Sequence, residues 1–216
     1  MSRDFDGEKE RYYILLEGGD NVGKGTQLKL LGNYFLEKDI PFITIIEPGE
    51  TEQGKLIRNI LLERKEFNLH PLTELFLYEA DRVEIFHKVI IPSLENKISV
   101  LEDRSWPSTK AYQGFAGGVD KTHKGLVDYL NKIATFNTFP DILFIIDGNP
   151  SKLIKNIQNP DRMELKGDEF HKQVNESYLK VAKMFPNISV VIPYREGGIE
   201  RMQQEMRYHL SQKLRI

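Results

Sequence analysis

Short apolar runs alternate along the chain with longer segments in which apolar residues recur at a helical period. The apolar runs are five or six residues long, rich in β-branched or aromatic side chains, and bounded by turn or charged residues. Continuous apolar character of this length predicts strands that are covered on both faces. The predicted strands are Tyr12–Glu17, Phe42–Ile46, Ile98–Glu102, Ile142–Asp147 and Ile188–Ile192. The predicted helices are Thr26–Lys38, Gly54–Glu63, Leu72–His87, Lys121–Ala134, Ser151–Gln158, Glu164–Met184 and Glu200–Leu214.

This alternation predicts an α/β fold, a doubly wound, five-stranded parallel sheet flanked by helices. The 216 residues are enough for one sizeable domain, and no repeat, low-complexity tract or linker divides them. We therefore expect a single domain over residues 1–216. Ligands in such sheets bind beyond the carboxyl ends of the strands. The chemistry is expected just after Glu17, Ile46, Leu101 and Ile146.

Composition and charge exclude several classes of protein. The 30 Lys and Arg residues nearly balance the 32 Asp and Glu residues, whereas a nucleic-acid platform would be strongly basic. No apolar run approaches the roughly 20 residues that a membrane span needs, and the polar N-terminal residues are unlike a signal peptide. The chain has no Cys, which excludes disulfides and thiolate chemistry. We expect a cytoplasmic protein that binds neither nucleic acid nor membrane.

A glycine-rich loop joins the first predicted strand to the first predicted helix. Gly18 and Gly23 bracket four residues, and Lys24 follows. Glycines let the backbone turn tightly so that N–H groups point at phosphate oxygens, and the helix adds the positive end of its dipole. Lys24 can then bridge the β- and γ-phosphates of a nucleoside triphosphate. The alternative, an ordinary glycine-rich turn, is disfavoured by the matching strand and helix on either side. The residues expected to bind the ATP phosphates are Gly18, Asn21, Val22, Gly23, Lys24, Gly25 and Thr26.

Two residues are candidates for binding Mg²⁺. The position after the loop lysine normally carries a hydroxyl that meets the metal, but here it is Gly25, and Thr26 is the nearest substitute. The form Gly-Lys-Gly-Thr-Gln resembles the loop of adenylate kinases. Asp103 follows the third strand, where a carboxylate commonly organises Mg²⁺ directly or through water. The alternative for Asp103 is a cap on the next helix.

Three arginines come from segments that should converge at the same edge of the sheet. They are Arg58, Arg82 and Arg104. Because guanidinium groups bind phosphate with two parallel hydrogen bonds, their joint placement predicts a second phosphate site. Any one of them alone would more often be a solvated or salt-bridged surface residue. Tyr78 lies one helical turn before Arg82, so the two share a face. A ring beside an arginine suits a stacked base, with core packing as the alternative.

Together these residues resemble the thymidylate kinase (dTMP kinase) family over nearly the whole chain. The most specific match is Asp103-Arg104 followed by the segment from Ser108 to Gly114, since the phosphate loop alone is shared with many unrelated proteins. The other matching parts are Asp20, Glu47-Pro-Gly49, Arg58, the segment from Tyr78 to Arg82, and the segment from Asp161 to Glu164. The resemblance implies a P-loop NTPase-like fold with a short lid at about 150–166. It also implies Mg²⁺-dependent transfer of the ATP γ-phosphoryl group to dTMP, giving dTDP and ADP, by a homodimer.

The resemblance also implies a role for each matching residue. Asp20 would bind the deoxyribose 3′-hydroxyl, and Tyr112 would crowd the sugar 2′ position against ribonucleotides. Arg58 and Arg104 would hold the acceptor phosphate. Tyr78 would stack on thymine, and Arg82 would contact the edge of the base. The whole implied dTMP-binding set is Asp20, Glu47, Arg58, Tyr78, Arg82, Arg104, Ser108, Tyr112 and Gln113, and the implied catalytic set is Lys24, Asp103, Arg104 and Arg162.

The chain departs from the family pattern at two places. Asn21 stands where one branch of the family carries an arginine, and members without that arginine usually supply several from the lid. This lid offers only Arg162, with Lys152, Lys155 and Lys166 nearby. The family's Arg-Glu-Pro-Gly-Gly reads Ile46-Glu-Pro-Gly-Glu50 here.

Three other functions are weighed against dTMP phosphorylation. A kinase for another deoxynucleoside monophosphate, dUMP or dGMP, is compatible with Tyr78 and Glu50. A guanine-reading switch usually carries Asn-Lys-x-Asp, and both Asn-Lys pairs here, at Asn96 and Asn131, lack the final Asp. A catalytically silent nucleotide-binding relative is suggested only by the incomplete lid.

Overall fold

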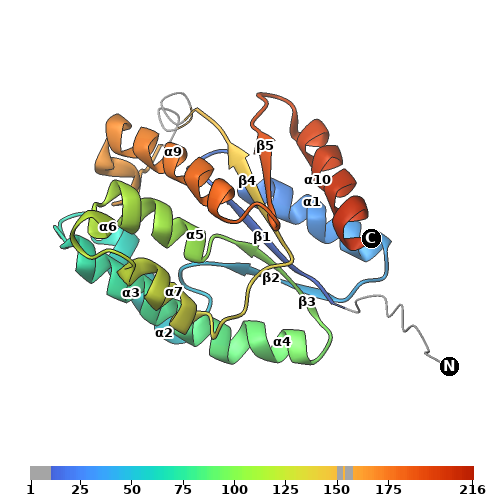
Figure 1. Cartoon of the computed structure of the whole chain (residues 1–216), viewed down its shortest axis with the longest axis horizontal. Helices are drawn as coiled ribbons and strands as arrows, with labels where there is room; N and C mark the ends of the chain where they lie inside the picture. The colour runs from blue at the N-terminus through green and yellow to red at the C-terminus, as the bar shows by residue number, and fades with distance from the viewer. Residues whose placement is uncertain (1–10, 150–152, 154–157) are drawn as a thin grey trace.

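The computed structural model describes residues 11–149, 153 and 158–216. Their centre is a five-stranded, wholly parallel sheet of order β2-β3-β1-β4-β5 (Figure 1). The predicted α/β fold is confirmed, and each predicted strand agrees with an observed one to within one residue. The strands are β1 Tyr13–Gly18, β2 Phe42–Ile46, β3 Ser99–Asp103, β4 Ile142–Asp147 and β5 Ser189–Pro193.

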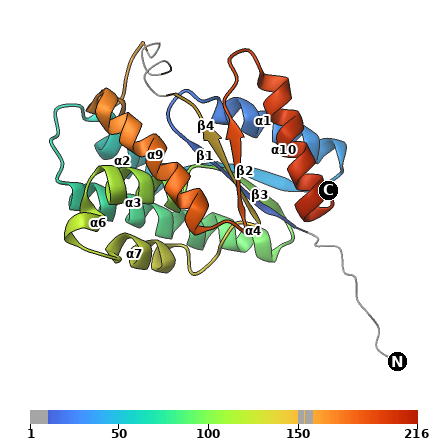
Figure 2. The same cartoon turned by 45° about the horizontal axis from the view of Figure 1, so that its top comes forward.

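Both faces of the sheet are covered, because alternate side chains of the central strands enter two separate cores. On β1, Tyr13 and Leu15 belong to one core, whereas Ile14 and Leu16 belong to the other. Helices α1 (Lys24–Glu37) and α10 (Ile199–Leu214) cover one face (Figures 1 and 2). On the opposite side lie α3 (Pro71–Ile85), α4 (Ile91–Glu95), α5 (Trp106–Thr109) and α9 (Asp168–Met184). This double burial explains the continuous apolar runs of the central strands, whereas the edge strands β2 and β5 each expose two of their five residues.

The remaining helical segments lie between the strands or after β4. Before β3 these segments are α2 Glu52–Arg58, the π-helical turn η1 Asn59–Glu63, α3 Pro71–Ile85, the π-helical turn η2 Phe86–Ile90 and α4 Ile91–Glu95. After β3 they are α5 Trp106–Thr109, the π-helical segment η3 Lys110–Ala116, α6 Val119–Thr122, α7 Leu126–Ala134, the 3₁₀ turn η5 Glu164–Lys166 and α9 Asp168–Met184.

The sequence-based helix assignments need four corrections. The helical segment 106–116 was not predicted, because it buries polar side chains such as Lys110 and Gln113 and so shows no simple apolar stripe. The helix predicted from Leu72 continues through η2 and α4 to Glu95. The two helices predicted over 121–134 and 164–184 are each interrupted at a glycine, Gly125 with φ 76° and Gly167 with φ 86°, a backbone region that favours glycine.

Two parts of the predicted organisation lie largely beyond the described residues. The helix predicted at 151–158 falls there, as do Lys152 and Lys155 of the predicted lid. Within the described part of the chain, no helix combines the length and apolar character needed to cross a membrane.

Candidate active site

A cavity of about 250 Å³ opens at the carboxyl ends of β1, β2 and β3. Its walls come from the loop after β1, the segment after β2, the ends of α2 and α3, the segment from Asp103 to Gln113, and the segment from Asp161 to Glu164. This is the edge of the sheet at which the chemistry was expected, because parallel strands present their carboxyl ends together.

The phosphate loop lies at one side of this cavity, between the end of β1 and the start of α1. A Cβ at Gly18 would lie only 2.5 Å from the backbone oxygen of Ile146, so the close approach of the loop to β4 requires glycine. Gly23 has φ 87° and precedes α1 without a side-chain cap, which leaves the first N–H groups of the helix to meet an anion. Lys24 is buried, and its ammonium group donates to the backbone oxygens of Gly18 at 3.2 Å and Gly19 at 2.7 Å. The pKa of Lys24 is lowered mainly by burial and secondly by the positive charge of Arg104.

The other predicted ATP-binding residues occupy different surroundings. Val22 is buried in the core beneath the loop, whereas Gly25 and Thr26 are exposed in the first turn of α1. The Asn21 amide donates to the backbone oxygen of Leu153 at 3.1 Å, so it ties the loop to the region after β4.

Arg104 lies at the centre of the site, in a left-handed backbone conformation with φ 68°. Such strain in a non-glycine residue occurs mainly where function fixes the geometry. Its guanidinium donates to Asp20, to the Gly18 backbone oxygen at 3.1 Å, to Tyr178 Oη at 3.0 Å and to Ser108 Oγ at 3.3 Å. The Tyr112 hydroxyl donates to the second oxygen of Asp20 at 2.9 Å. Burial alone would raise the pKa of Asp20, but Arg104 and Lys24 together outweigh it and lower the pKa.

Beneath Arg104 lies a buried carboxylate, Glu17, which the sequence did not single out as a site residue. It accepts hydrogen bonds from the backbone N–H of Ser105 at 2.8 Å and of Ser108 at 3.1 Å. It also accepts from the Ser108 hydroxyl at 2.7 Å and from the Tyr178 hydroxyl at 2.9 Å. Burial raises the pKa of Glu17, and Arg104 opposes that effect. Ser108, a member of the implied dTMP-binding set, therefore also belongs to this network under the arginine.

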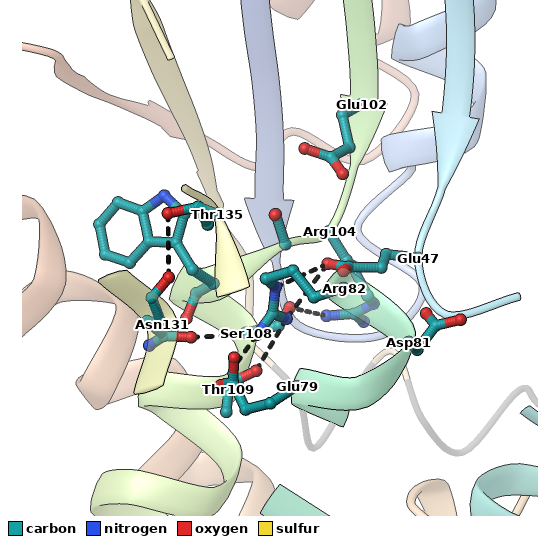
Figure 3. A network of polar contacts seen from close by, with 12 residues as sticks. Glu47, Glu79, Asp81, Arg82, Glu102, Arg104, Ser108, Thr109, Asn131 and Thr135 are labelled. Carbon is teal, nitrogen blue, oxygen red and sulfur yellow. Dashed lines mark hydrogen bonds and ion pairs between the residues drawn. The ribbon is translucent and has the colours of Figure 1, made fainter. Parts of the chain in front are cut away.

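Arg82 is fully buried, and protein groups engage all three nitrogens of its guanidinium. It donates to Glu47 from Nε at 3.3 Å and Nη2 at 3.1 Å, to Asn131 at 3.0 Å and to Thr109 at 2.9 Å, and it forms an ion pair with Glu79 at 3.0 Å (Figure 3). The predicted hydrogen bond from Arg82 to a base would require one of these partners to be exchanged. In this arrangement Arg82 orders the wall of the cavity.

Glu47 is the first residue after β2 and is nearly fully buried. Burial raises the pKa of Glu47 to about 8, although Arg82 opposes that effect. Its Oε1 has no hydrogen-bond partner within the described part of the chain. Glu102, on the adjacent strand, is also buried, and burial followed by the charge of Glu47 raises its pKa (Figure 3).

The remaining predicted acceptor residues line the same cavity. Arg58 donates to the backbone oxygen of Pro48 at 2.8 Å, and it lies so close to Gly49 that a Cβ there would be 2.8 Å from Arg58 Cδ. Tyr78 and Gln113 are also cavity-lining residues, and the Gln113 amide donates to Glu74 at 3.1 Å.

Arg162 is placed differently from the cavity-lining residues around it. Asp161, Met163 and Glu164 line the cavity, whereas Arg162 donates to the Leu61 backbone oxygen at 2.7 Å and to Glu74 at 2.6 Å. Its guanidinium is thus held in the cavity wall.

The carboxylate of Asp103, at the end of β3, is suited to binding a divalent cation. Asp103 is 8% exposed, lines the cavity, and has an Oδ1 without a hydrogen-bond partner among the described residues. It does not cap α5, whose N-cap residue is Ser105. An unpartnered carboxylate oxygen beside a phosphate loop is a ligand that Mg²⁺ favours. The described residues contain no group of three or more His, Cys, Asp or Glu placed to hold a metal ion.

Comparison with known proteins decides the family. The family model described as thymidylate kinase matches residues 16–206. This chain belongs to the thymidylate kinase family. It is 36% identical over 199 residues to the thymidylate kinase of Thermoanaerobacter sp. (strain X514), covering 91% of this chain and 93% of that relative. It is 39% identical over 204 residues to that of Thermosipho melanesiensis, covering 91% of this chain and all of the relative. The crystal structure of thymidylate kinase from Ehrlichia chaffeensis has a TM-score of 0.76 at 32% identity, covering 93% of this chain and 98% of that one.

Against this family background, the sequence-based site assignments divide into two groups. The nine residues of the implied dTMP-binding set all line the one cavity, together with Lys24 and Asp103. The residues that line it do not include Arg162, nor the other predicted phosphate-binding residues Gly18, Asn21, Val22, Gly23, Gly25 and Thr26. The sequence analysis missed several residues that build the site, because no local motif marks them: Glu17, Glu74, Thr109, His171 and Tyr178. For Glu74 one signal was available, since it lies one helical turn before Tyr78 and so shares its face.

Proposed function

We propose that this protein transfers the γ-phosphoryl group of ATP to dTMP in a Mg²⁺-dependent reaction that gives dTDP and ADP. The observation that carries the proposal is the shared cavity. It brings the implied acceptor-binding residues to the same rim as Lys24 of the phosphate loop. Phosphoryl transfer needs two anions held in line, their repulsion neutralised, and water excluded.

In this mechanism the protein positions the reactants and neutralises charge. Lys24 and the N–H groups at the start of α1 hold the donor phosphates, and Arg104 contacts the group in transit. Arg58 orients the acceptor phosphate, while Tyr78 and Gln113 enclose the base. Ionised Asp20 accepts a hydrogen bond from the sugar hydroxyl. No residue needs to act as a general base.

Asp103 and Thr26 are the residues proposed to hold Mg²⁺, directly or through water. When bound, the metal would neutralise charge on the donor phosphates. The unpartnered Asp103 Oδ1 supports the first assignment, whereas Thr26 rests on its position in the loop. A catalytic role for Arg162 remains a prediction that would require its guanidinium to leave Glu74.

The test is a coupled assay of ADP release with ATP and Mg²⁺ across the common nucleoside monophosphates. We expect the highest kcat/KM with dTMP and no turnover in excess EDTA. Preference for dUMP or dGMP would replace the substrate assignment with the nearest alternative. Absence of ADP release with every added monophosphate would favour the catalytically silent relative, and ADP release that depends on added dTMP would rule it out.

We also propose that the protein is a homodimer that associates through α3 and α7. Exposed apolar side chains lie on these neighbouring helices, with Phe76 53%, Tyr129 62% and Ile133 50% exposed. Substituting Phe76→Asp is expected to convert the dimer to a monomer in sedimentation equilibrium. A wild-type monomer at micromolar concentration would refute the proposal. The cytoplasmic location stays a prediction from the sequence.

A further inference from the structure

One buried carboxylate, Glu74, joins three separate parts of the cavity wall. It lies on α3 and is only 2% exposed. It accepts hydrogen bonds from Gln113 on η3 at 3.1 Å, from Arg162 at 2.6 Å, and from Lys166 at 2.8 and 2.9 Å. The two cations come from the segment 161–166 and lie 88 and 92 residues from Glu74 along the chain. A single carboxylate thus connects this segment to the helix that carries Tyr78.

The segment 161–166 is itself ordered as a compact turn. Asp161 Oδ1 accepts from the backbone N–H of Met163 at 2.8 Å and of Glu164 at 2.9 Å, and Glu164 Oε2 accepts from the backbone N–H of Asp161 at 2.7 Å. This reciprocal pairing is that of a capping box. It places Asp161, Met163 and Glu164 in the cavity wall and turns Arg162 towards Glu74.

Arg162 extends the connection to a third element. Its backbone N–H donates to the Leu62 backbone oxygen at 2.9 Å, and its Nε donates to that of Leu61 at 2.7 Å. Both leucines belong to η1, which directly follows the helix that ends at Arg58. Breaking the contact between Glu74 and Arg162 would therefore loosen the wall on the side of the acceptor phosphate as well as on the side of the base.

We propose that Glu74 is a positioning residue that latches the segment 161–166 over the acceptor site, and that Arg162 and Lys166 serve this latch. The kinetic part of this inference rests on the proposed function. The carboxylate can do this because it is ionised. Burial opposes ionisation, but Lys166 and Arg162 lower the pKa of Glu74 overall. Separating a buried carboxylate from either of its two cationic partners is costly. This cost favours the arrangement in which the segment 161–166 stays in contact with Glu74.

The activity-independent test is limited trypsin digestion of the full chain, because trypsin cuts after Arg162 and Lys166. Arg162 is 7% exposed and held by its bonds, so wild-type cleavage at these sites should be slow. Glu74→Gln keeps the size of the side chain but removes its charge, and we expect cleavage at the two sites to accelerate at least about tenfold. The matched control is Glu37→Gln, which breaks an exposed Glu–Arg pair between α1 and α10. Unchanged cleavage in folded Glu74→Gln would overturn the latch.

If Glu74→Gln fails to fold, Lys166→Met provides the second variant. Lys166 is 26% exposed, and its loss leaves the Arg162 bond in place. Cleavage after Arg162 should still accelerate measurably, and equal rates in this variant and the wild type would reject the proposal. Because digestion needs no turnover, these outcomes separate failure of the latch from failure of the proposed reaction.

Kinetics of a double-mutant cycle distinguish a latch from a catalytic Arg162. If both residues act through the latch, Glu74→Gln and Arg162→Met should each raise the KM for dTMP at least about tenfold, and the double variant should be little worse than either. The KM for ATP should change much less. If Arg162→Met instead lowered kcat about a hundredfold or more in both backgrounds, while Glu74→Gln left the KM for dTMP unchanged, the inference would be wrong.

Discussion

Replacing Arg104 by alanine is the substitution for which the structure gives the most specific prediction, a loss of both turnover and stability. The side chain donates to four acceptors and lies with its guanidinium carbon 5.4 Å from the centre of the Tyr112 ring. Its removal would withdraw the cation that the mechanism needs at the transferred phosphoryl group. It would also leave Asp20 as a partly buried charge with Lys24 and His171 as its neighbouring basic side chains.

The two effects have different expected magnitudes. Arginines that stabilise phosphoryl transfer contribute about 10³–10⁵ in kcat, so kcat should fall by at least ~10³-fold, or about 4 kcal/mol of activation free energy. Breaking a buried ion pair costs roughly 3–5 kcal/mol. Because the Arg104 and Asp20 side chains are 19% and 16% exposed, we take the lower end. For a chain of this length, ~3 kcal/mol corresponds to a fall in Tm of roughly 6–12 °C.

The assay measures ADP release against dTMP and ATP separately, with binding of a fluorescent ATP analogue as a third readout. ATP binding should survive, because the phosphate loop and α1 retain their own contacts. Arg207→Ala, which removes an exposed pair with Glu37, is the control for loss of a surface arginine. Near-normal kcat in a folded Arg104→Ala protein would remove Arg104 from the mechanism and refute this reasoning.

Three further predictions test other parts of the site. Lys24→Ala should abolish measurable transfer in the same assay, and an active variant would discredit the phosphate-loop assignment. Gly49→Ala should raise the KM for dTMP about tenfold, because the added Cβ would lie 2.8 Å from Arg58 Cδ and because Gly49 has φ 112°. The control is Gly118→Ala, since Gly118 also has a positive φ, 78°, but has open space around it. Burial raises the pKa of Glu47 to about 8, so the folded protein binds a proton that the unfolded chain releases near its ordinary pKa. Relative to Glu47→Gln, the wild-type free energy of unfolding should therefore fall between about pH 5 and 8, by at most about 1.4 kcal/mol per pH unit. Parallel pH profiles from urea unfolding would contradict that assignment.

The sequence by itself determined the fold class and many of the polar residues that line the cavity, although not Thr109. The central strands were predictable because strands covered on both faces must be apolar at nearly every position. The edge strands β2 and β5 are partly exposed, and they were predictable from their short runs of β-branched and aromatic residues, which is also a local signal. The loop from Gly18 to Lys24 was predictable for the same reason, since tight turns and phosphate binding constrain adjacent residues. The convergence of Arg58, Arg82 and Arg104 followed from the rule that parallel strands present their carboxyl ends at one edge.

Only the tertiary structure decided what each charged group does within that cavity. Arg82 and Arg162 look alike in sequence, as arginines near a phosphate site, yet each is engaged by a buried carboxylate and by other protein groups. Glu17 and Glu74 carried no motif, because their partners lie far away along the chain, 39 or more residues for Glu74 and 88 or more for Glu17. A buried charge is costly unless it is paired or hydrogen-bonded, so its role depends on the groups that contact it. Those partners are set by packing between distant segments, which local spacing does not encode.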